Sequence, residues 1–222
     1  MKITKELIES INAKEKYDFD DLLTIMELLR SEGGCPWDRA QTHESIRHNL
    51  LEETYEAVEA IDENDRELLL EELGDVLLQV VFHARISEEA GDFDIVDICD
   101  GVCRKLVRRH PHIFADEKRG SADEVLDRWE QIKVSEKKSQ KCSDELERVA
   151  KTLPALSRAQ KVAKKATAAG YELREVSDDA PIADKLFALC LQAQKEGIDA
   201  EEALRMKTNE YIETIKEKEN ET

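Results

Sequence analysis

Apolar residues recur at helical spacing along most of the chain, and no stretch shows the alternation of a half-buried strand. The clearest stretch covers residues 46–84, where two helical patterns flank a short polar turn at 62–65. The apolar stripes of these two patterns are Ile46, Leu50, Ala57 and Ile61, then Leu69, Leu73, Val76, Val80 and Ala84. A turn this short makes consecutive helices antiparallel neighbours. The pattern therefore predicts an all-α fold containing a helical hairpin.

The same spacing predicts further helices along the chain. We expect them over 20–30, from 95 to just before Pro111, from 121, over 153–169 and 181–195, and from 199 to about 217. Ile98, Val102 and Leu106 are expected to face inward on the helix that begins near 95. A Gly-Gly pair and a proline break the chain at 33–38. Trp37 in this break either packs against an edge of the core or lines a ligand pocket, and packing is the commoner role.

Acidic residues are placed along the two helices of the hairpin in pairs. Glu53 and Glu56 lie on the first helix, and Glu72 and Asp75 lie on the second. A spacing of three puts each pair on one side of its helix, and Glu53 falls inside the apolar stripe. Converging carboxylates repel each other and are costly to bury unless a hard cation lies between them. The pattern predicts a magnesium site, although single pairs of this kind are common in so acidic a chain.

Composition narrows the class of protein. The 222 residues include 51 acidic and 33 basic ones, for a formal charge of −18, which disfavours nonspecific binding to nucleic acid or anionic membrane. No apolar run is long enough to span a bilayer, and the first residues lack the apolar segment of a signal peptide. The five cysteines are odd in number and irregularly spaced. We therefore expect reduced thiols and a cytoplasmic protein.

Positive charge gathers at the end of the helix that begins near 95, and this cluster has two interpretations. Lys105 and Arg109 belong to it. The cations either stabilise the carboxyl end of the helix or bind a polyphosphate held beside the metal. Spacing alone does not choose between the two. A metal site at Cys99 and Cys103, which share a helix face, is the weaker hypothesis.

Three segments in fixed order resemble the MazG family of nucleoside triphosphate pyrophosphohydrolases. They are GGCPWDRAQTHESIRHNLLEETYEAVEAID at 33–62, EELGDVLLQVVFHA at 71–84 and KLVRRHPHIF at 105–114. The resemblance covers about residues 18–133. It implies an all-α, usually dimeric fold whose acidic site is completed by dimerisation. It also implies hydrolysis of a nucleoside triphosphate to monophosphate and pyrophosphate with Mg²⁺, for which Mn²⁺ can substitute.

The resemblance also implies roles for individual residues. It carries the acidic motif onto Glu52, Glu53, Glu56, Glu72 and Asp75, and the substrate-binding positions onto Lys105, Arg109, Trp129 and Lys133. We expect the last four acids of that motif to hold the metal. Glu53 and Glu52 are the expected catalytic residues, and Glu52 would orient or deprotonate the attacking water.

Two other functions fit parts of the pattern. A di-iron carboxylate bundle typically needs Glu-x-x-His on paired helices, and this sequence contains none. A non-catalytic helical protein that regulates a partner would explain the amphipathic helices but not Glu53 within a core stripe. We therefore expect an enzyme, with the interaction protein as the alternative.

The second half resembles a reduced copy of the same domain. We expect a catalytic domain over 1–138 and a degenerate helical domain over 139–222. The stretches at 153–173 and 183–212 resemble the entry and the closing helices of a second domain. Only ten residues separate Tyr171 from Pro181, too few for the acidic helix between them. Asp184 is the one acid retained from that motif, so the second half is expected to be catalytically silent.

Overall fold

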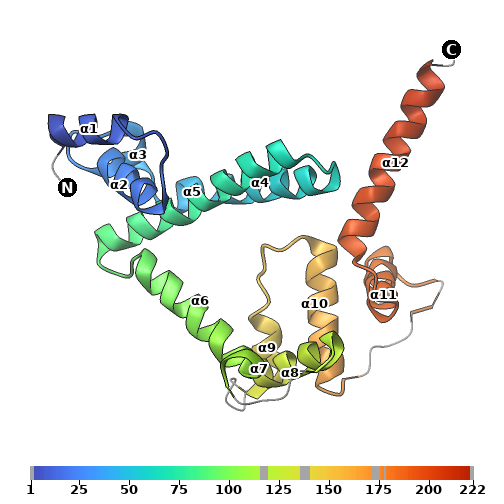
Figure 1. Cartoon of the computed structure of the whole chain (residues 1–222). Helices are drawn as coiled ribbons and strands as arrows, with labels where there is room; N and C mark the ends of the chain where they lie inside the picture. Colours follow the sequence, from blue (N-terminus) through green and yellow to red (C-terminus); the bar gives the residue numbers. More distant parts are fainter. Residues whose placement is uncertain (1–2, 116–119, 136–140, 172–175, 178, 221–222) are drawn as a thin grey trace. The chain divides into compact units, whose positions relative to one another are not determined.

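The computed structural model describes residues 3–115, 120–135, 141–171, 176–177 and 179–220. These residues form twelve helices, and no strand occurs among them, which confirms the all-α prediction. The chain divides into two compact units, Met1–Trp129 and Glu130–Thr222. The elements of the first unit are α1 (Lys5–Asn12), α2 (Phe19–Arg30), α3 (Pro36–Ala40), α4 (His43–Asp62), α5 (Arg66–Ala90), α6 (Ile95–Arg109), α7 (Pro111–Phe114) and most of α8 (Ala122–Ser135), as labelled in Figure 1.

The predicted hairpin is formed by α4 and α5, which lie side by side in Figure 1. Thr42 caps α4 by accepting a hydrogen bond from the backbone N–H of Ser45, whose side chain bonds back to the N–H of Thr42. Asn64 adopts a left-handed conformation with φ 54° in the turn, and Asp65 caps the first N–H groups of α5. Gly91 ends α5 with φ 78°, as a C-terminal glycine typically does. The hairpin is therefore defined at each end by local sequence.

The core of the first unit lies where α2 crosses the hairpin. It consists of Met26, Ile46, Val81 and Phe82, with Leu22, Leu23, Leu78, Ile86 and Ile95 packed around them. The guanidinium of Arg30 lies 5.3 Å from the centre of the Phe82 ring and forms an ion pair of 2.7 Å with Glu89 near the end of α5. It also donates hydrogen bonds to the carbonyls of Asp38 and Gln41. Arg30 thus links α2 to α3 and to α5.

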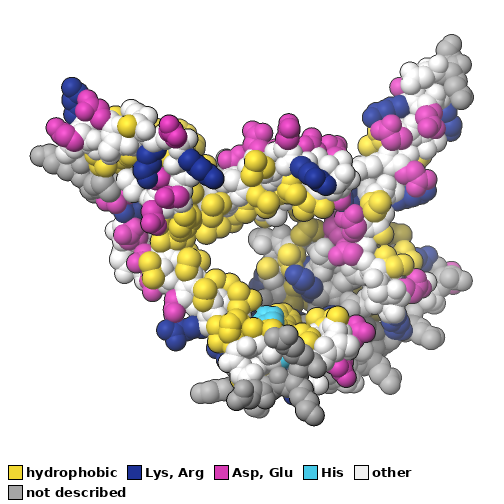
Figure 2. All heavy atoms as spheres, in the orientation of Figure 1, with side chains coloured by type: hydrophobic (Ala, Val, Ile, Leu, Met, Phe, Trp, Pro, Cys, Tyr) yellow, Lys and Arg dark blue, Asp and Glu magenta, His cyan; other side chains and the backbone are white. Residues whose placement is uncertain are grey.

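Several residues predicted to face inward are exposed. Ile61 and Leu73 are 59% and 54% exposed, and no residue of α6 is buried, with Leu106 at 46% and Val102 at 40%. The predictions that these residues face inward on three helices were therefore wrong. The physical reason is that the far half of the hairpin and most of α6 have no covering helix in this unit. Figure 2 shows the resulting apolar surface in yellow along the hairpin and along α6.

The second unit contains α9 (Cys142–Glu147), α10 (Ala155–Ala168), α11 (Ile182–Lys195) and α12 (Ala200–Asn220). The Gln160 side chain of α10 links it to α11 and α12, since its amide nitrogen donates to the carbonyls of Cys190 and Ile198 and its oxygen accepts from the N–H of Ala200. The described residues between α10 and α11 contain no helix, but 172–175 and 178, which include Glu172 and Glu175, lie outside them. The predicted loss of the acidic helix therefore stays a prediction. The expected boundary at residue 138 also falls outside the described residues.

Three further observations concern the short helices, the cysteines and the question of a membrane-spanning helix. The short helices α3, α7 and α9 lie outside the ranges where helices were expected. All five cysteines have free thiols. Within the described part of the chain, no helix combines the length and apolar character that crossing a membrane requires.

Candidate metal centre

Three of the four predicted metal ligands converge on the hairpin. Glu53 and Glu56 of α4 and Glu72 of α5 each offer a carboxylate oxygen, and these oxygens all lie within 4.8 Å of one another. This is the only group of at least three potential ligand residues in the part of the chain that the structure describes. The antiparallel packing of the two helices brings the acids together across the seam, as their spacing predicted. Glu72 is only 8% exposed.

The crowding of these acids affects their ionisation. Burial, followed by the charges of Asp75 and Glu56, raises the pKa of Glu53 above its usual value. Burial, followed by the charges of Glu56 and Asp75, does the same for the pKa of Glu72. Removing negative charge from water and placing it beside like charge both favour the protonated acid. A divalent cation would reverse this effect, so the carboxylates fit a hard metal ion.

The other two acids of the motif lie around this group. The charge of Asp75 acts on both Glu53 and Glu72, although no Asp75 oxygen belongs to the converging set. Glu52 is exposed and lies outside that set. One turn beyond Asp75, Gln79 is only 7% exposed, and its side-chain oxygen has no hydrogen-bond partner among the described residues. A buried polar atom left unpaired next to a group of acids is a second sign of a ligand site.

The structure brings together two of the predicted substrate-binding residues. The Arg109 guanidinium at the end of α6 lies 5.1 Å from the centre of the Trp129 ring of α8, a cation–π arrangement. Lys105 is exposed one turn earlier on α6. The side chain of Lys133 is outside the described residues. Figure 1 shows α6 running away from the hairpin, so the structure does not bring this basic end to the acids within one protomer.

Trp37 does not fill an edge of the core. Its side chain is 61% exposed on the short helix α3, which contradicts the packing role that its residue type favoured. The indole face is therefore available to solvent or to a ligand.

Sequence reasoning missed a polar contact at the other end of the hairpin. The Nδ1 atoms of His43 and His83 lie 2.7 Å apart with stacked rings, and the Ser87 hydroxyl lies 3.2 Å from Nε2 of His43. A consistent neutral arrangement has Ser87 donating to His43 and His43 donating to His83. Burial, and then the nearby His43, lowers the pKa of His83. The pairing of the two helices contained this signal. Because Glu53 lies opposite Glu72 in an antiparallel pair, His43, ten residues before Glu53, is expected close to His83, about ten residues after Glu72.

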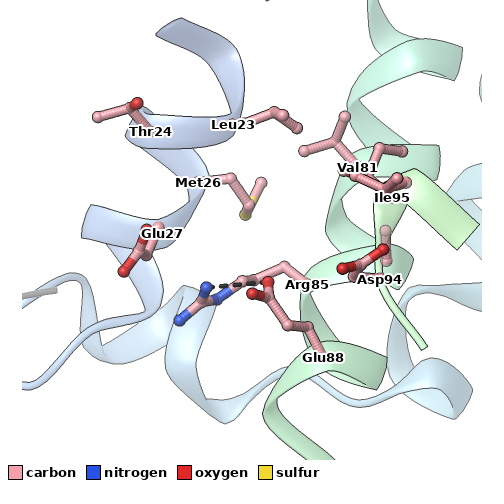
Figure 3. Close-up of a pocket in the computed structure, with 11 residues that line it drawn as sticks. Leu23, Thr24, Met26, Glu27, Val81, Arg85, Glu88, Asp94 and Ile95 are labelled. Atoms are coloured by element: carbon pink, nitrogen blue, oxygen red, sulfur yellow. Dashed lines mark hydrogen bonds and ion pairs between the residues drawn. The ribbon is translucent and has the colours of Figure 1, made fainter. Parts of the chain in front are cut away.

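A pocket elsewhere in the first unit does not compete with this site. Figure 3 shows it between α2, α5 and the start of α6, with Met26 and Val81 among its apolar lining residues. Its polar groups already interact with each other or with the backbone: Arg85 pairs with Glu88 at 3.0 Å, and Asp94 caps α6. None of the predicted site residues is among the described residues that line it.

Comparison with known proteins agrees with the acidic motif. Residues 41–114 match the family described as the MazG nucleotide pyrophosphohydrolase domain. The chain is 40% identical to the nucleoside triphosphate pyrophosphohydrolase/pyrophosphatase MazG of Thermotoga maritima, over 90% of this chain and 85% of that protein. It is 46% identical to the nucleoside triphosphate pyrophosphohydrolase of Escherichia coli K12, over 76% of this chain and 63% of that protein.

A solved structure is also similar. The crystal structure of a mazG-related protein from Thermotoga maritima is 30% identical in sequence, with a TM-score of 0.45, and the match covers 52% of this chain and 98% of that one. The family assignment depends on the sequences, because the identity to the curated Thermotoga protein extends over most of both chains. The chain therefore belongs to the MazG nucleotide pyrophosphohydrolase family.

Proposed function

We propose that this protein hydrolyses nucleoside triphosphates, ribo- or deoxyribonucleotides, at the α-phosphorus to give monophosphate and pyrophosphate. The observation that carries the proposal is the convergence of Glu53, Glu56 and Glu72 on one hairpin. The raised pKa values of Glu53 and Glu72 support it, because they indicate a site that is electrostatically incomplete without a cation. The curated relatives named as nucleoside triphosphate pyrophosphohydrolases support the reaction.

The residues of the hairpin would hold Mg²⁺, with Mn²⁺ able to substitute. Glu53, Glu56, Glu72 and Asp75 offer oxygen ligands, which both ions accept. The bound ion would supply charge neutralisation at the triphosphate and a lowered pKa for water. Glu52, exposed beside this group, is in our proposal the residue that orients the attacking water or takes its proton. Glu53 acts both as a ligand and as a catalytic carboxylate.

The nucleotide would be bound by the basic end of α6. Lys105 and Arg109 carry the positive charge that a pyrophosphate leaving group requires, and Lys133 would add to it. Trp129 keeps the Arg109 guanidinium in place through their ring contact. This part of the proposal needs the basic end to reach the acids, and a second copy of the chain would allow that.

A homodimer would also cover the exposed apolar surface of the hairpin. Leu51, Tyr55 and Val58 form an exposed stripe on α4, and Leu70, Leu73 and Leu77 form another on α5, with exposed fractions between 37% and 77%. Large contiguous apolar patches on a protein surface mark interaction sites. Two hairpins packed through these stripes would make a four-helix bundle, the simplest way to bury both.

The second unit has no acidic site among its described residues. Asp184 is exposed in the first turn of α11 and belongs to no converging group of ligands. We propose that the catalytic domain covers 1–138 and that 139–222 is a silent, degenerate copy retained for packing. A role in the cytoplasm, in clearing the nucleotide pool or in stress regulation, is consistent with five free thiols.

Product analysis with a panel of nucleotides tests the proposal. The eight common ribo- and deoxyribonucleoside triphosphates are each incubated with the protein and Mg²⁺, and the products are identified by ion-exchange chromatography. We expect monophosphate and pyrophosphate, with no turnover when the metal is chelated. Diphosphate plus phosphate would show cleavage at another phosphorus. The absence of turnover with every nucleotide would favour the alternative, a non-catalytic helical partner protein.

A further inference from the structure

The side chain of Gln79 is buried in the hairpin without a hydrogen-bond partner. It is 7% exposed, and no donor among the described residues reaches its amide oxygen. Buried polar side-chain atoms in native proteins are bonded to protein, to water or to a ligand in the large majority of cases. An unpaired buried amide oxygen therefore indicates a group that binds there from outside the chain.

The position of Gln79 places it next to the acids. Glu72, Asp75 and Gln79 are spaced by three and four residues, so they share one face of α5. That face meets α4, because Glu72 converges with Glu53 and Glu56. Farther along α5, His83 also meets α4 through its contact with His43. Gln79 lies between these two contacts, about one helical turn from Asp75.

A second buried glutamine shows how this residue is accommodated when its role is structural. Gln160 in the second unit is 9% exposed, close to the value for Gln79. Its amide nitrogen donates to the carbonyls of Ile198 and Cys190, and its oxygen accepts from the N–H of Ala200. Both polar ends of Gln160 are thus satisfied. The difference points to a role for Gln79 beyond packing.

We propose that Gln79 is a positioning residue of the metal centre, whose amide oxygen accepts a hydrogen bond from a water molecule held at the acidic site. This inference rests on the proposed metal site. A neutral acceptor suits the position, because it orients water without adding a further charge to the crowded carboxylates. An oriented water fixes the directions of the carboxylates around the ion, as outer partners do at other metal sites. Gln79 would thereby increase metal affinity without contacting the substrate.

Metal binding in the absence of nucleotide tests this role. Mg²⁺ and, separately, Mn²⁺ are titrated into full-length protein, and the dissociation constant is obtained by calorimetry, with the melting temperature of the metal-free protein measured in parallel. Gln79→Met keeps the volume but removes the acceptor. We expect metal affinity to fall by about 10–100-fold in this variant, the range found for outer partners of metal ligands. The melting temperature without metal should not fall, since no bond made by the amide oxygen is lost.

Two further variants separate the acceptor from general effects. Gln79→Glu retains an acceptor oxygen and should bind metal at least as tightly as the wild type. Gln160→Met, the matched control, should lower the melting temperature without metal and leave metal affinity unchanged. Gln79→Leu provides the same test as the methionine variant with a second apolar side chain, in case the first does not fold.

The outcomes distinguish this inference from the proposed metal site. Wild-type metal affinity in both apolar Gln79 variants would overturn the role of Gln79 while leaving the metal site standing. A wild-type protein that binds neither Mg²⁺ nor Mn²⁺ would overturn the metal site, and the role of Gln79 with it. Weaker binding in the apolar variants together with retention in Gln79→Glu would establish the positioning role.

Discussion

At the scale of single residues, the acids of the hairpin are arranged in a way that suits cation binding and lowers the stability of the metal-free fold. Glu53 and Glu72 have raised pKa values because burial and neighbouring carboxylates disfavour their charged forms. A protein under no demand to bind a cation would gain stability by replacing one of them with a neutral residue. A bound cation would stabilise the charged forms of both acids and would explain why they are placed together.

Neutralising one ligand should abolish activity without harming the fold. In Glu72→Gln we expect turnover to fall by about 100-fold or more, because a proposed ligand of the metal is lost, and removal of even an outer partner of a ligand costs about 10–100-fold. The melting temperature without metal should be equal or higher, since repulsion among the acids decreases. Glu59→Gln, an exposed change on the same hairpin, is the control and should behave as wild type. Near-wild-type turnover in Glu72→Gln would contradict the site assignment.

The His43–His83 contact should make stability depend on pH. The folded state lowers the pKa of His83 below its ordinary value of 6.5, so the unfolded chain binds protons more readily. The stability that the neutral pair contributes is complete above about pH 6.5 and is lost as the pH falls toward the lowered pKa. Melting temperatures measured from pH 8 to pH 5 should fall less steeply in His83→Gln than in wild type. His48→Gln, at an exposed position of α4, should follow the wild-type curve; equal slopes in all three proteins would contradict the prediction.

At the scale of elements, the local sequence defines where the helices begin, end and turn. The capping boxes at Asp18, Thr42 and Asp94 satisfy the first N–H groups of α2, α4 and α6. Gly34, in the break after α2, is required for a different reason. A side chain there would overlap with the carbonyl oxygens of Leu28 and Leu29 in the last turn of that helix.

Two glycine substitutions should therefore have opposite effects. Gly34→Ala should reduce the free energy of unfolding by about 1–3 kcal/mol, the usual cost of overpacking. Gly101→Ala, inside α6 with open space around the added carbon, should increase it by about 0.5–1 kcal/mol through helix propensity. Urea denaturation of the two variants and the wild type measures both changes. A stabilised Gly34→Ala would show that the turn relaxes more easily than its geometry indicates.

At the scale of the whole molecule, part of the hairpin has no covering element among the described residues of the first unit. Its far half exposes Leu70 at 77% and Tyr55 at 58%, and the basic end of α6 diverges from the acids in Figure 1. The proposed second copy would cover the apolar stripes of the hairpin and would supply the cations that the acidic site needs. Oligomeric state and activity are therefore expected to change together.

Charge placed on the exposed stripe should separate the protomers. Leu70→Arg should weaken dimerisation by about tenfold or more, because charged residues are disfavoured at the centre of an interface. The fold of each protomer should persist, given the exposure of this side chain. Light scattering across a concentration series, together with the turnover rate, measures the effect. Ile8→Arg, at another exposed apolar position, is the control, and a fully active wild-type monomer at micromolar concentration would refute the dimer.

The two units should differ in their contribution to catalysis. Asp75→Asn in the full-length protein should abolish turnover, whereas Asp184→Asn in the full-length protein should leave it unchanged. Asp75 lies beside the converging acids Glu53, Glu56 and Glu72. Asp184 is exposed and belongs to no converging set of acids among the described residues. Steady-state kinetics of the two variants test the difference. Loss of turnover in Asp184→Asn with an intact helical signal would show that the second unit contains a working site.

The sequence alone determined the features that depend on local interactions. Helical periodicity predicted the hairpin, and residues close in the chain cap its two helices and end the second one. The spacing of the acids was sufficient to predict that Glu53, Glu56 and Glu72 meet, since a short turn leaves an antiparallel pair little freedom. The shortened connection before Pro181 likewise predicts the loss of the acidic helix from the second half, and this stays a prediction because part of that connection lies outside the described residues.

Only the tertiary structure decided which apolar stripes are covered and which polar groups are left unpaired. Leu73, Val102 and Leu106 have the periodicity of core residues, yet burial depends on a neighbouring element that periodicity does not specify. The exposure of Trp37 and the contact between His43 and His83 depend in the same way on segments distant in the chain. The unpaired oxygen of Gln79 belongs here too, because a hydrogen bond requires a donor within about 3 Å, and that proximity is a property of the packed helices.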